Sequence, residues 1–64
     1  MKATIHYDNG NTAPVTAKMY TGGLHYIEFR YNGETYVLGH TKLAEHGIIQ
    51  VTKDSNGKTL WSLN

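Results

Sequence analysis

The chain contains no cysteine among its 64 residues. No disulfide can therefore crosslink it, and no thiolate is available as a nucleophile or as a metal ligand. A chain of this length buries only about 60% of the surface that its unfolded form exposes. A small core must therefore provide the stability, alone or with the help of a second copy. We expect a single small β domain over residues 1–64, with a homodimer as one way of stabilising it.

Long apolar runs and strong net charge are also missing. No apolar run approaches the roughly 18 residues of a membrane span, and the first ten residues, MKATIHYDNG, lack the apolar segment of a signal peptide. We therefore expect a cytoplasmic protein, encoded by a complete small reading frame, without a membrane partner. The formal charge is +1 and the pI about 8.1, whereas nucleic-acid-binding domains usually have a pI above about 9.

The tetrapeptide Asn-Gly-x-Thr occurs three times, at residues 9–12, 32–35 and 56–59. Asn-Gly tolerates positive φ and is the strongest short hairpin signal when alternating apolar residues flank it. The recurring threonine is a β-branched residue that enters a strand. Outside the turns the three segments share little, which favours convergent turn chemistry over internal duplication. The sequence predicts hairpins over about 2–19, 24–39 and 48–63.

The middle copy fits a two-residue type I′ loop at Asn32-Gly33. This loop pairs Tyr31 with Glu34, Phe29 with Tyr36 and Ile27 with Leu38. One face of the hairpin then carries Ile27, Phe29, Tyr36 and Leu38, which we expect to be buried. The opposite face carries Tyr26, Glu28, Arg30, Thr35 and Val37.

The first and third copies require three-residue loops, because a two-residue loop would pair Ile5 with Pro14 in the first copy. With the loop Asp8–Gly10, Gly10 becomes the left-handed residue of a bulge. The resulting apolar stripe is Ala3, Ile5, Tyr7, Ala13, Val15, Ala17 and Met19. In the third copy, the loop Ser55–Gly57 pairs Val51 with Trp61, Ile49 with Leu63 and Lys53 with Thr59, and it turns Leu60 outward.

The remaining segments connect the hairpins. Thr21–Gly23 is a break between the first two, and a short α or 3₁₀ helix is predicted over about 41–46, with Thr41 as N-cap and Gly47 after its end. Leu43 would close one end of the core. Pro14 has no N–H, so its strand lies at an edge or a bulge. The fold class is therefore all-β, as an antiparallel sheet or a small barrel.

Residues that could carry out catalysis or bind metal show no supporting pattern. His6, His25, His40 and His46 lack the spacing of a metal site, although His40, Glu45 and His46 could converge in space. Ser55 and Ser62 lie outside a nucleophile motif. No phosphate-binding glycine motif accompanies Gly22-Gly23, and a large pocket is difficult to form in so small a core. We expect no enzyme activity, no metal and no cofactor.

The outward faces carry residues typical of binding sites. Tyr and Arg are enriched in interface hot spots, and we predict a partner-binding surface at Tyr20, Tyr26, Arg30 and Val37. The alternative is that Tyr26 and Val37 only cover each other or a neighbouring loop. Small barrels can also stack nucleic-acid bases on aromatic residues, with candidates Lys2, His6, Lys18, Tyr20, His25, Tyr26 and Arg30.

In general form this short, cysteine-free chain, with the hairpin segment FRYNGETYVL, is similar to small proteins of phages and other mobile elements. Some such proteins bind and block host defence machinery. The similarity includes no diagnostic motif, so no residue role follows from it. We predict a non-catalytic protein that binds another protein, as an inhibitor of a host factor, with nucleic-acid binding as the alternative.

Overall fold

The computed structural model describes residues 1–64 as six strands and two short 3₁₀ turns, without an α-helix. The strands are β1 (Lys2–Tyr7), β2 (Thr12–Tyr20), β3 (Gly23–Tyr31), β4 (Glu34–Gly39), β5 (Ile48–Lys53) and β6 (Thr59–Ser62). The 3₁₀ turns, η1 (His40–Lys42) and η2 (Ala44–His46), connect β4 to β5. No helix in the structure has the length and apolar character needed to cross a membrane.

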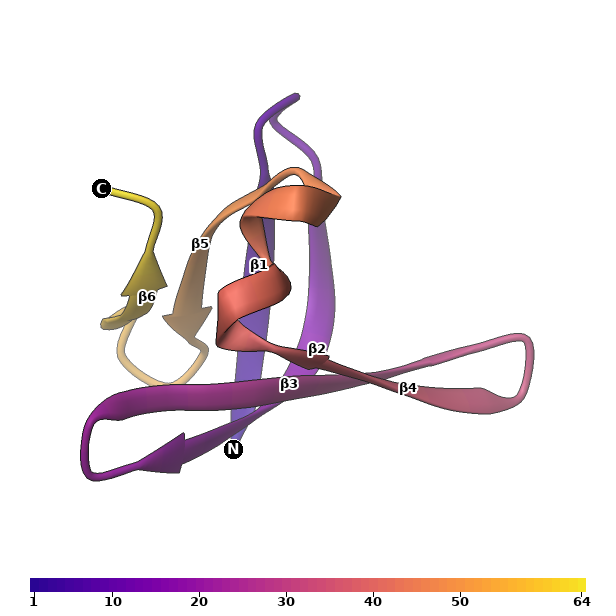
Figure 1. Ribbon diagram of the computed structural model, residues 1–64, viewed down its shortest axis with the longest axis horizontal. Helices are drawn as coiled ribbons and strands as arrows, with labels where there is room; N and C mark the ends of the chain where they lie inside the picture. Colours follow the sequence, from indigo (N-terminus) through magenta and orange to yellow (C-terminus); the bar gives the residue numbers. More distant parts are fainter.

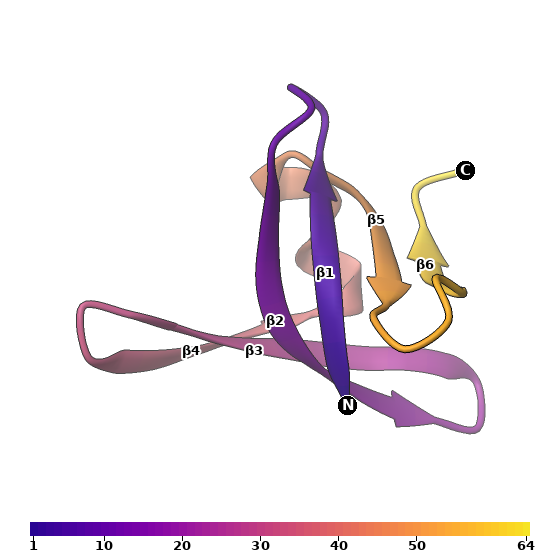
Figure 2. The same cartoon turned by 180° about the vertical axis from the view of Figure 1, so that it is seen from behind.

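The six strands form one antiparallel sheet in the order β4-β3-β2-β1-β5-β6 (Figure 1). The third hairpin therefore joins the first hairpin through the pairing of β5 with β1. The sheet curls enough to bring β6 close to the first half of β3, as Figures 1 and 2 show from opposite sides. It does not close into a barrel, and β4 and β6 remain as edge strands.

The predicted registers of the first two hairpins are confirmed. Ala3 lies opposite Val15 and Ile5 opposite Ala13, while Tyr31 lies opposite Glu34. The turn residues have the predicted left-handed backbone, with φ of 89° at Gly10, 51° at Asn32 and 80° at Gly33.

The third hairpin follows a different path near its turn. Val51 pairs with Trp61 as predicted, and the Leu63 N–H donates to the Ile49 carbonyl at 2.9 Å. However, the Lys53 N–H bonds the Lys58 carbonyl at 2.8 Å, so the loop contains four residues, 54–57, and Lys53 does not pair with Thr59. Thr52 instead lies opposite Thr59, which leaves Leu60 as an extra residue in a bulge.

The prediction that Leu60 faces outward is wrong because of this bulge. A bulge reverses the alternation of side chains along a strand, and Leu60 is half-buried and packs against the core together with Trp61. A second irregularity lies in β5, where Tyr7 pairs with Ile48 while His6 pairs with Gln50. Ile49 is the extra residue there, and it is exposed.

The core lies on one side of the curled sheet. Its buried members are Ala3, Ile5, Val15, Ala17, Leu24, Ile27, Leu43, Ile48 and Val51. The apolar stripe predicted for the first hairpin is confirmed, since Tyr7, Ala13 and Met19 pack against these residues. Leu43 lies between η1 and η2 with none of its surface exposed, so it closes the core as predicted.

The connector contains two 3₁₀ turns and no continuous helix over 41–46. The prediction that Thr41 caps this helix is wrong, because Thr41 lies inside η1 and no side chain caps either turn. Gly47 ends η2 in the left-handed conformation, at φ 76°, and its N–H bonds the Ala44 carbonyl at 3.1 Å. That role for Gly47 was predicted.

Candidate functional site

The β3–β4 hairpin extends beyond the rest of the sheet because β2 stops pairing with β3 near Pro14. The last pair between these strands is Thr16 with Glu28. The Ala17 N–H bonds the Met1 carbonyl at 2.7 Å, so odd-numbered residues of β2 face β1 and the position of Pro14 faces β3. Proline has no N–H to donate there. β3 therefore separates from β2, and the hairpin continues as a two-stranded arm over residues 28–37 (Figure 1, right; Figure 2, left).

The arm exposes several large apolar side chains. The exposed fractions are 64% for Tyr31, 60% for Val37 and 41% for Tyr36. Tyr36 was expected in the core, and this expectation is wrong because nothing covers that end of the hairpin. Its ring stacks on Phe29 with centroids 5.6 Å apart, and its hydroxyl donates to the Glu34 carboxylate at 3.1 Å.

Three of the four predicted binding residues lie on one face of the arm and its base. We call this the outer face, and it consists of Tyr26, Glu28, Arg30, Thr35 and Val37. Strand pairing places Glu28 opposite Val37 and Arg30 opposite Thr35. Tyr26 and Arg30 are four residues apart on β3, which corresponds to about 13 Å along the strand. The outer face is therefore a continuous strip on two paired strands.

Tyr20, the fourth predicted residue, lies near the Tyr26 end of the strip and is joined to Tyr26 through the His25 ring. It is 49% exposed, and its ring centroid is 5.5 Å from that of His25 and 6.1 Å from that of His40. The His25 ring is in turn 5.1 Å from that of Tyr26. The His40 Nδ1 lies 3.1 Å from the His25 carbonyl oxygen, which ties η1 to β3. These four rings form an aromatic cluster, and Tyr26 is half-buried within it.

Arg30 and Val37 are the more accessible members of the predicted set. The Arg30 side chain is exposed and donates to the Gly33 carbonyl at 3.2 Å, which holds it near the turn of the arm. Val37 is at the base of the arm, next to Glu28. Neither side chain packs against the core. Changes at these two positions can therefore test binding with little effect on folding.

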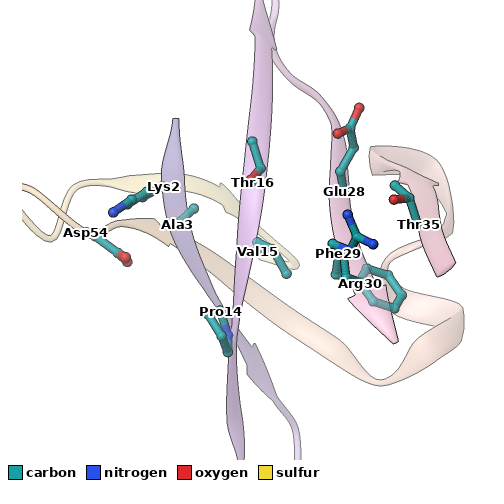
Figure 3. A pocket seen from close by; sticks show the side chains of 10 residues that line it. All are labelled: Lys2, Ala3, Pro14, Val15, Thr16, Glu28, Phe29, Arg30, Thr35 and Asp54. Atoms are coloured by element: carbon teal, nitrogen blue, oxygen red, sulfur yellow. The ribbon is translucent and has the colours of Figure 1, made fainter. Parts of the chain in front are cut away.

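The separation of β2 and β3 opens a pocket of about 550 Å³ beside the outer face. Its lining includes Pro14, Val15 and Thr16 of β2, Phe29 and Arg30 of β3, and Thr35 of β4. Figure 3 shows Lys2 and Asp54 on one side of the pocket and Glu28 and Arg30 on the other. We expected a chain of this size to have difficulty forming such a pocket. It forms between strands that diverge, outside the core.

The charges around the pocket alternate in sign. Lys2 and Arg30 provide positive charge, and Glu28 and Asp54 provide negative charge. None of the four forms an ion pair, since the one ion pair of the structure joins Lys42 and Glu45 at 3.6 Å. Asp54 accepts a hydrogen bond from the Thr4 hydroxyl at 2.7 Å. The pocket can therefore bind polar groups of either charge beside the apolar surfaces of Pro14 and Phe29.

The candidate metal ligands do not converge. His40 and His46 lie in separate 3₁₀ turns, and Glu45 pairs with Lys42. His6 lies on β1, where its Nε2 is 2.9 Å from the Thr52 hydroxyl. No group of three or more His, Asp or Glu side chains is placed to hold a metal ion.

Sequence reasoning missed the pocket and the exposed ends of the arm. Lys2 and Asp54 line the pocket only because β1 and the loop after β5 lie near β3. Local sequence patterns do not show that these segments are close in space. One signal was present. Pro14 predicts an edge or a bulge, and this prediction is wrong, because β2 is an interior strand and Pro14 pairs in regular register with Thr4. The side of β2 toward β3 is nevertheless unpaired at Pro14. A long hairpin facing a strand that contains a proline indicates that part of the hairpin lacks a neighbour.

Comparisons with protein-family models, with curated proteins and with solved structures found no match.

Proposed function

We propose that the chain is a non-catalytic protein that binds another protein through the outer face and the adjoining pocket. The observation that supports this most is the arm, which holds apolar and charged side chains away from the body on two paired strands. Single exposed apolar residues are ordinary on protein surfaces. Within the ten residues of the arm, however, Arg30 and Val37 are exposed on the outer face, while Tyr31 and Tyr36 are exposed on the opposite face, so both faces of the arm present apolar surface.

The chemistry of this surface fits a protein partner. Interface hot spots commonly combine Tyr and Arg with neighbouring apolar contacts that exclude water. The outer face provides Tyr26, Arg30 and Val37 in this arrangement, and the pocket beside it could receive a side chain of the partner. Glu28 and Asp54 would add polar contacts that select the partner.

Nucleic-acid binding is the alternative, and the same acidic residues weigh against it. Lys2 and Arg30 lie on opposite sides of the pocket, with Asp54 and Glu28 beside them. The two positive and two negative charges give the pocket no net positive charge, so they do not form a continuous positive track for a phosphate backbone. The rings of Tyr20, His25 and Tyr26 also pack edge to face against one another, which leaves less ring surface for stacking on bases.

Charge reversal at two exposed basic residues tests the proposal. The wild-type chain, Arg30→Glu and Lys58→Glu would be immobilised, and the proteins that each retains from a lysate of the source cells would be quantified. Both variants carry the same net charge, and Lys58, which follows the third loop, belongs neither to the outer face nor to the lining of the pocket. We expect one or more proteins to be retained by the wild type and by Lys58→Glu and to be lost with Arg30→Glu. A hot-spot arginine contributes about 2 kcal/mol or more, roughly thirtyfold in affinity.

Identical retention by all three proteins, with equal thermal melting, would refute a role for this surface. A parallel titration of labelled single- and double-stranded oligonucleotides, followed by fluorescence anisotropy, separates the two functions. Binding that weakens steeply as salt rises would favour the nucleic-acid alternative. The prediction that the chain is encoded by a phage or mobile element and inhibits a factor of the host stays a prediction, because it depends on general form.

A further inference from the structure

The two edges of the open sheet differ in how well they are protected. β6 has four residues, lies near β3 because of the curl, and packs Leu60 and Trp61 against the core. β4 has six residues, ETYVLG, and no strand covers its outer side. Natural edge strands usually avoid pairing with another chain through lysine, proline or a bulge. β4 contains none of these, and its pairing with β3 is regular.

The backbone groups that β4 presents follow from its turn. In a two-residue hairpin, the residues flanking the loop form a hydrogen-bonded pair. These are Tyr31 and Glu34, so Glu34, Tyr36 and Leu38 direct their backbone groups toward β3. The alternating residues Thr35, Val37 and Gly39 direct their N–H and C=O groups away from the sheet. The Gly39 carbonyl accepts the first hydrogen bond of η1, so the groups free to bond another strand are the N–H and C=O of Thr35 and Val37 and the N–H of Gly39.

We propose that a second copy of this chain pairs with β4 in an antiparallel arrangement about a two-fold axis at Val37. Val37 then lies opposite Val37 of the second copy, Thr35 opposite Gly39, and Tyr36 opposite Leu38. In this register the two Val37 residues exchange two hydrogen bonds, and the Gly39 N–H of each copy bonds the Thr35 carbonyl of the other. The sheet continues across both molecules through β4.

The side chains of β4 favour a second copy as the occupant. The register forms two equivalent aromatic–aliphatic pairs of Tyr36 with Leu38, a type of pair that stabilises sheets. Glu34, the only charged residue of the strand, comes opposite the position that follows the end of β4 and not opposite another acid. A register centred on Tyr36 is poorer, because it places Glu34 opposite Leu38 and Gly39 opposite Gly33 in the turn. The edge is therefore complementary to itself in one particular alignment.

The pairing also changes the surface described above. It places the outer faces of the two copies side by side, with the Val37 pair in the centre and Arg30 and Tyr26 of both copies around it. Self-pairing does not require the proposed protein partner, so either proposal can fail without the other. A single pair of six-residue strands buries less than the roughly 800 Å² per molecule of a standard stable interface. We therefore expect micromolar and not nanomolar self-affinity.

Proline substitutions at the two edges provide the test. Val37→Pro removes a free N–H from β4 without removing a bond to β3, since edge positions that face solvent accept proline. Ser62→Pro makes the equivalent change on β6, because the Leu63 N–H faces β5 and the neighbouring Ser62 N–H faces away from it. Val37→Lys blocks the β4 edge by charge and serves if the proline variant fails to fold. Circular dichroism reports folding for each variant.

Sedimentation velocity over a range from micromolar to near-millimolar protein would measure the mass. For the wild type and Ser62→Pro, we expect the mass to rise from 7.2 kDa toward twice that value. Val37→Pro removes two symmetry-related hydrogen bonds, so its dimer should dissociate about ten- to hundredfold more readily. Val37→Lys should likewise remain monomeric at concentrations where the wild type is dimeric.

Three outcomes would overturn the proposal. The wild type could remain monomeric at every concentration, which would leave β4 to a strand of another protein. The dimer could persist in folded Val37→Pro and Val37→Lys. Ser62→Pro could disrupt it as strongly as Val37→Pro does, which would place the contact at β6.

Discussion

Replacing Leu43 with alanine would test whether one side chain between the two 3₁₀ turns stabilises the whole sheet. Leu43 has no exposed surface. Its carbonyl accepts the N–H groups of His46 at 3.0 Å and Ile48 at 3.1 Å, so the backbone positions the side chain at the end of the core. The substitution leaves these two bonds in place. Any loss of stability should therefore come from packing.

The expected effect is large for a chain of this size. Leu→Ala at a fully buried site typically reduces the free energy of unfolding by about 2–5 kcal/mol, through lost burial and the cavity left behind. A domain of 64 residues has a total stability of roughly 3–10 kcal/mol at about 0.05–0.15 kcal/mol per residue. We expect a loss of about 3 kcal/mol. That change shifts the folding equilibrium more than about a hundredfold, and at the lower end of this stability range it leaves a measurable fraction of the variant unfolded without denaturant.

Urea titration, followed by the fluorescence of Trp61 and by circular dichroism, would measure this loss. Trp61 is the only tryptophan and packs against the core, so it reports on the same packing. The control is Leu63→Ala, which makes the same chemical change at a side chain that is 53% exposed. It should change the stability by less than about 0.5 kcal/mol. If Leu43→Ala lost less than about 1 kcal/mol, or no more than the control, the role assigned to Leu43 would be wrong.

The same titration checks two smaller effects. Gly33 has φ of 80°, and a Cβ added there would have no atom within 4 Å. Gly33→Ala should therefore lose about 1 kcal/mol of stability through backbone strain alone. An unchanged stability would argue against the type I′ turn. Thr52→Val removes the hydroxyl 2.9 Å from the partly buried His6 Nε2 and should lose about 0.5–1.5 kcal/mol. Thr59→Val, which removes only the exposed 2.9 Å bond from Gln50, should lose clearly less. Equal losses at the two threonines would mean that burial of the His6 contact adds nothing.

Two of the three turns could be predicted from the sequence because their requirements are local. Gly10, Asn32 and Gly33 tolerate positive φ, and alternating apolar residues on both sides leave one register that gathers them on a single face. The third turn could not be resolved in this way. The segment DSNGK contains suitable residues for a loop of either three or four residues. The choice depends on Leu60 reaching the core through a bulge, which is a tertiary gain.

The geometry of the proposed binding surface was predicted in part. Alternation alone placed Tyr26, Arg30 and Val37 on a common face of the second hairpin, and the strand pairing confirms that placement. The aromatic cluster joins Tyr20 to His40, which is 20 positions later in the chain and reaches it only through the end of β4. No local pattern contains that contact.

The sequence by itself determined the all-β class, the positions of the hairpins, two of the three registers and the apolar stripe of the first hairpin. Each of these depends on backbone preferences and on side-chain alternation within a few residues. The strand order, the pairing of β1 with β5 and the pocket were decided only by the tertiary structure. The exposure of Tyr36 belongs with them, because alternation assigns a side chain to a face of the sheet but not to a buried environment. A face is buried only where another segment covers it, and beyond Pro14 no segment does.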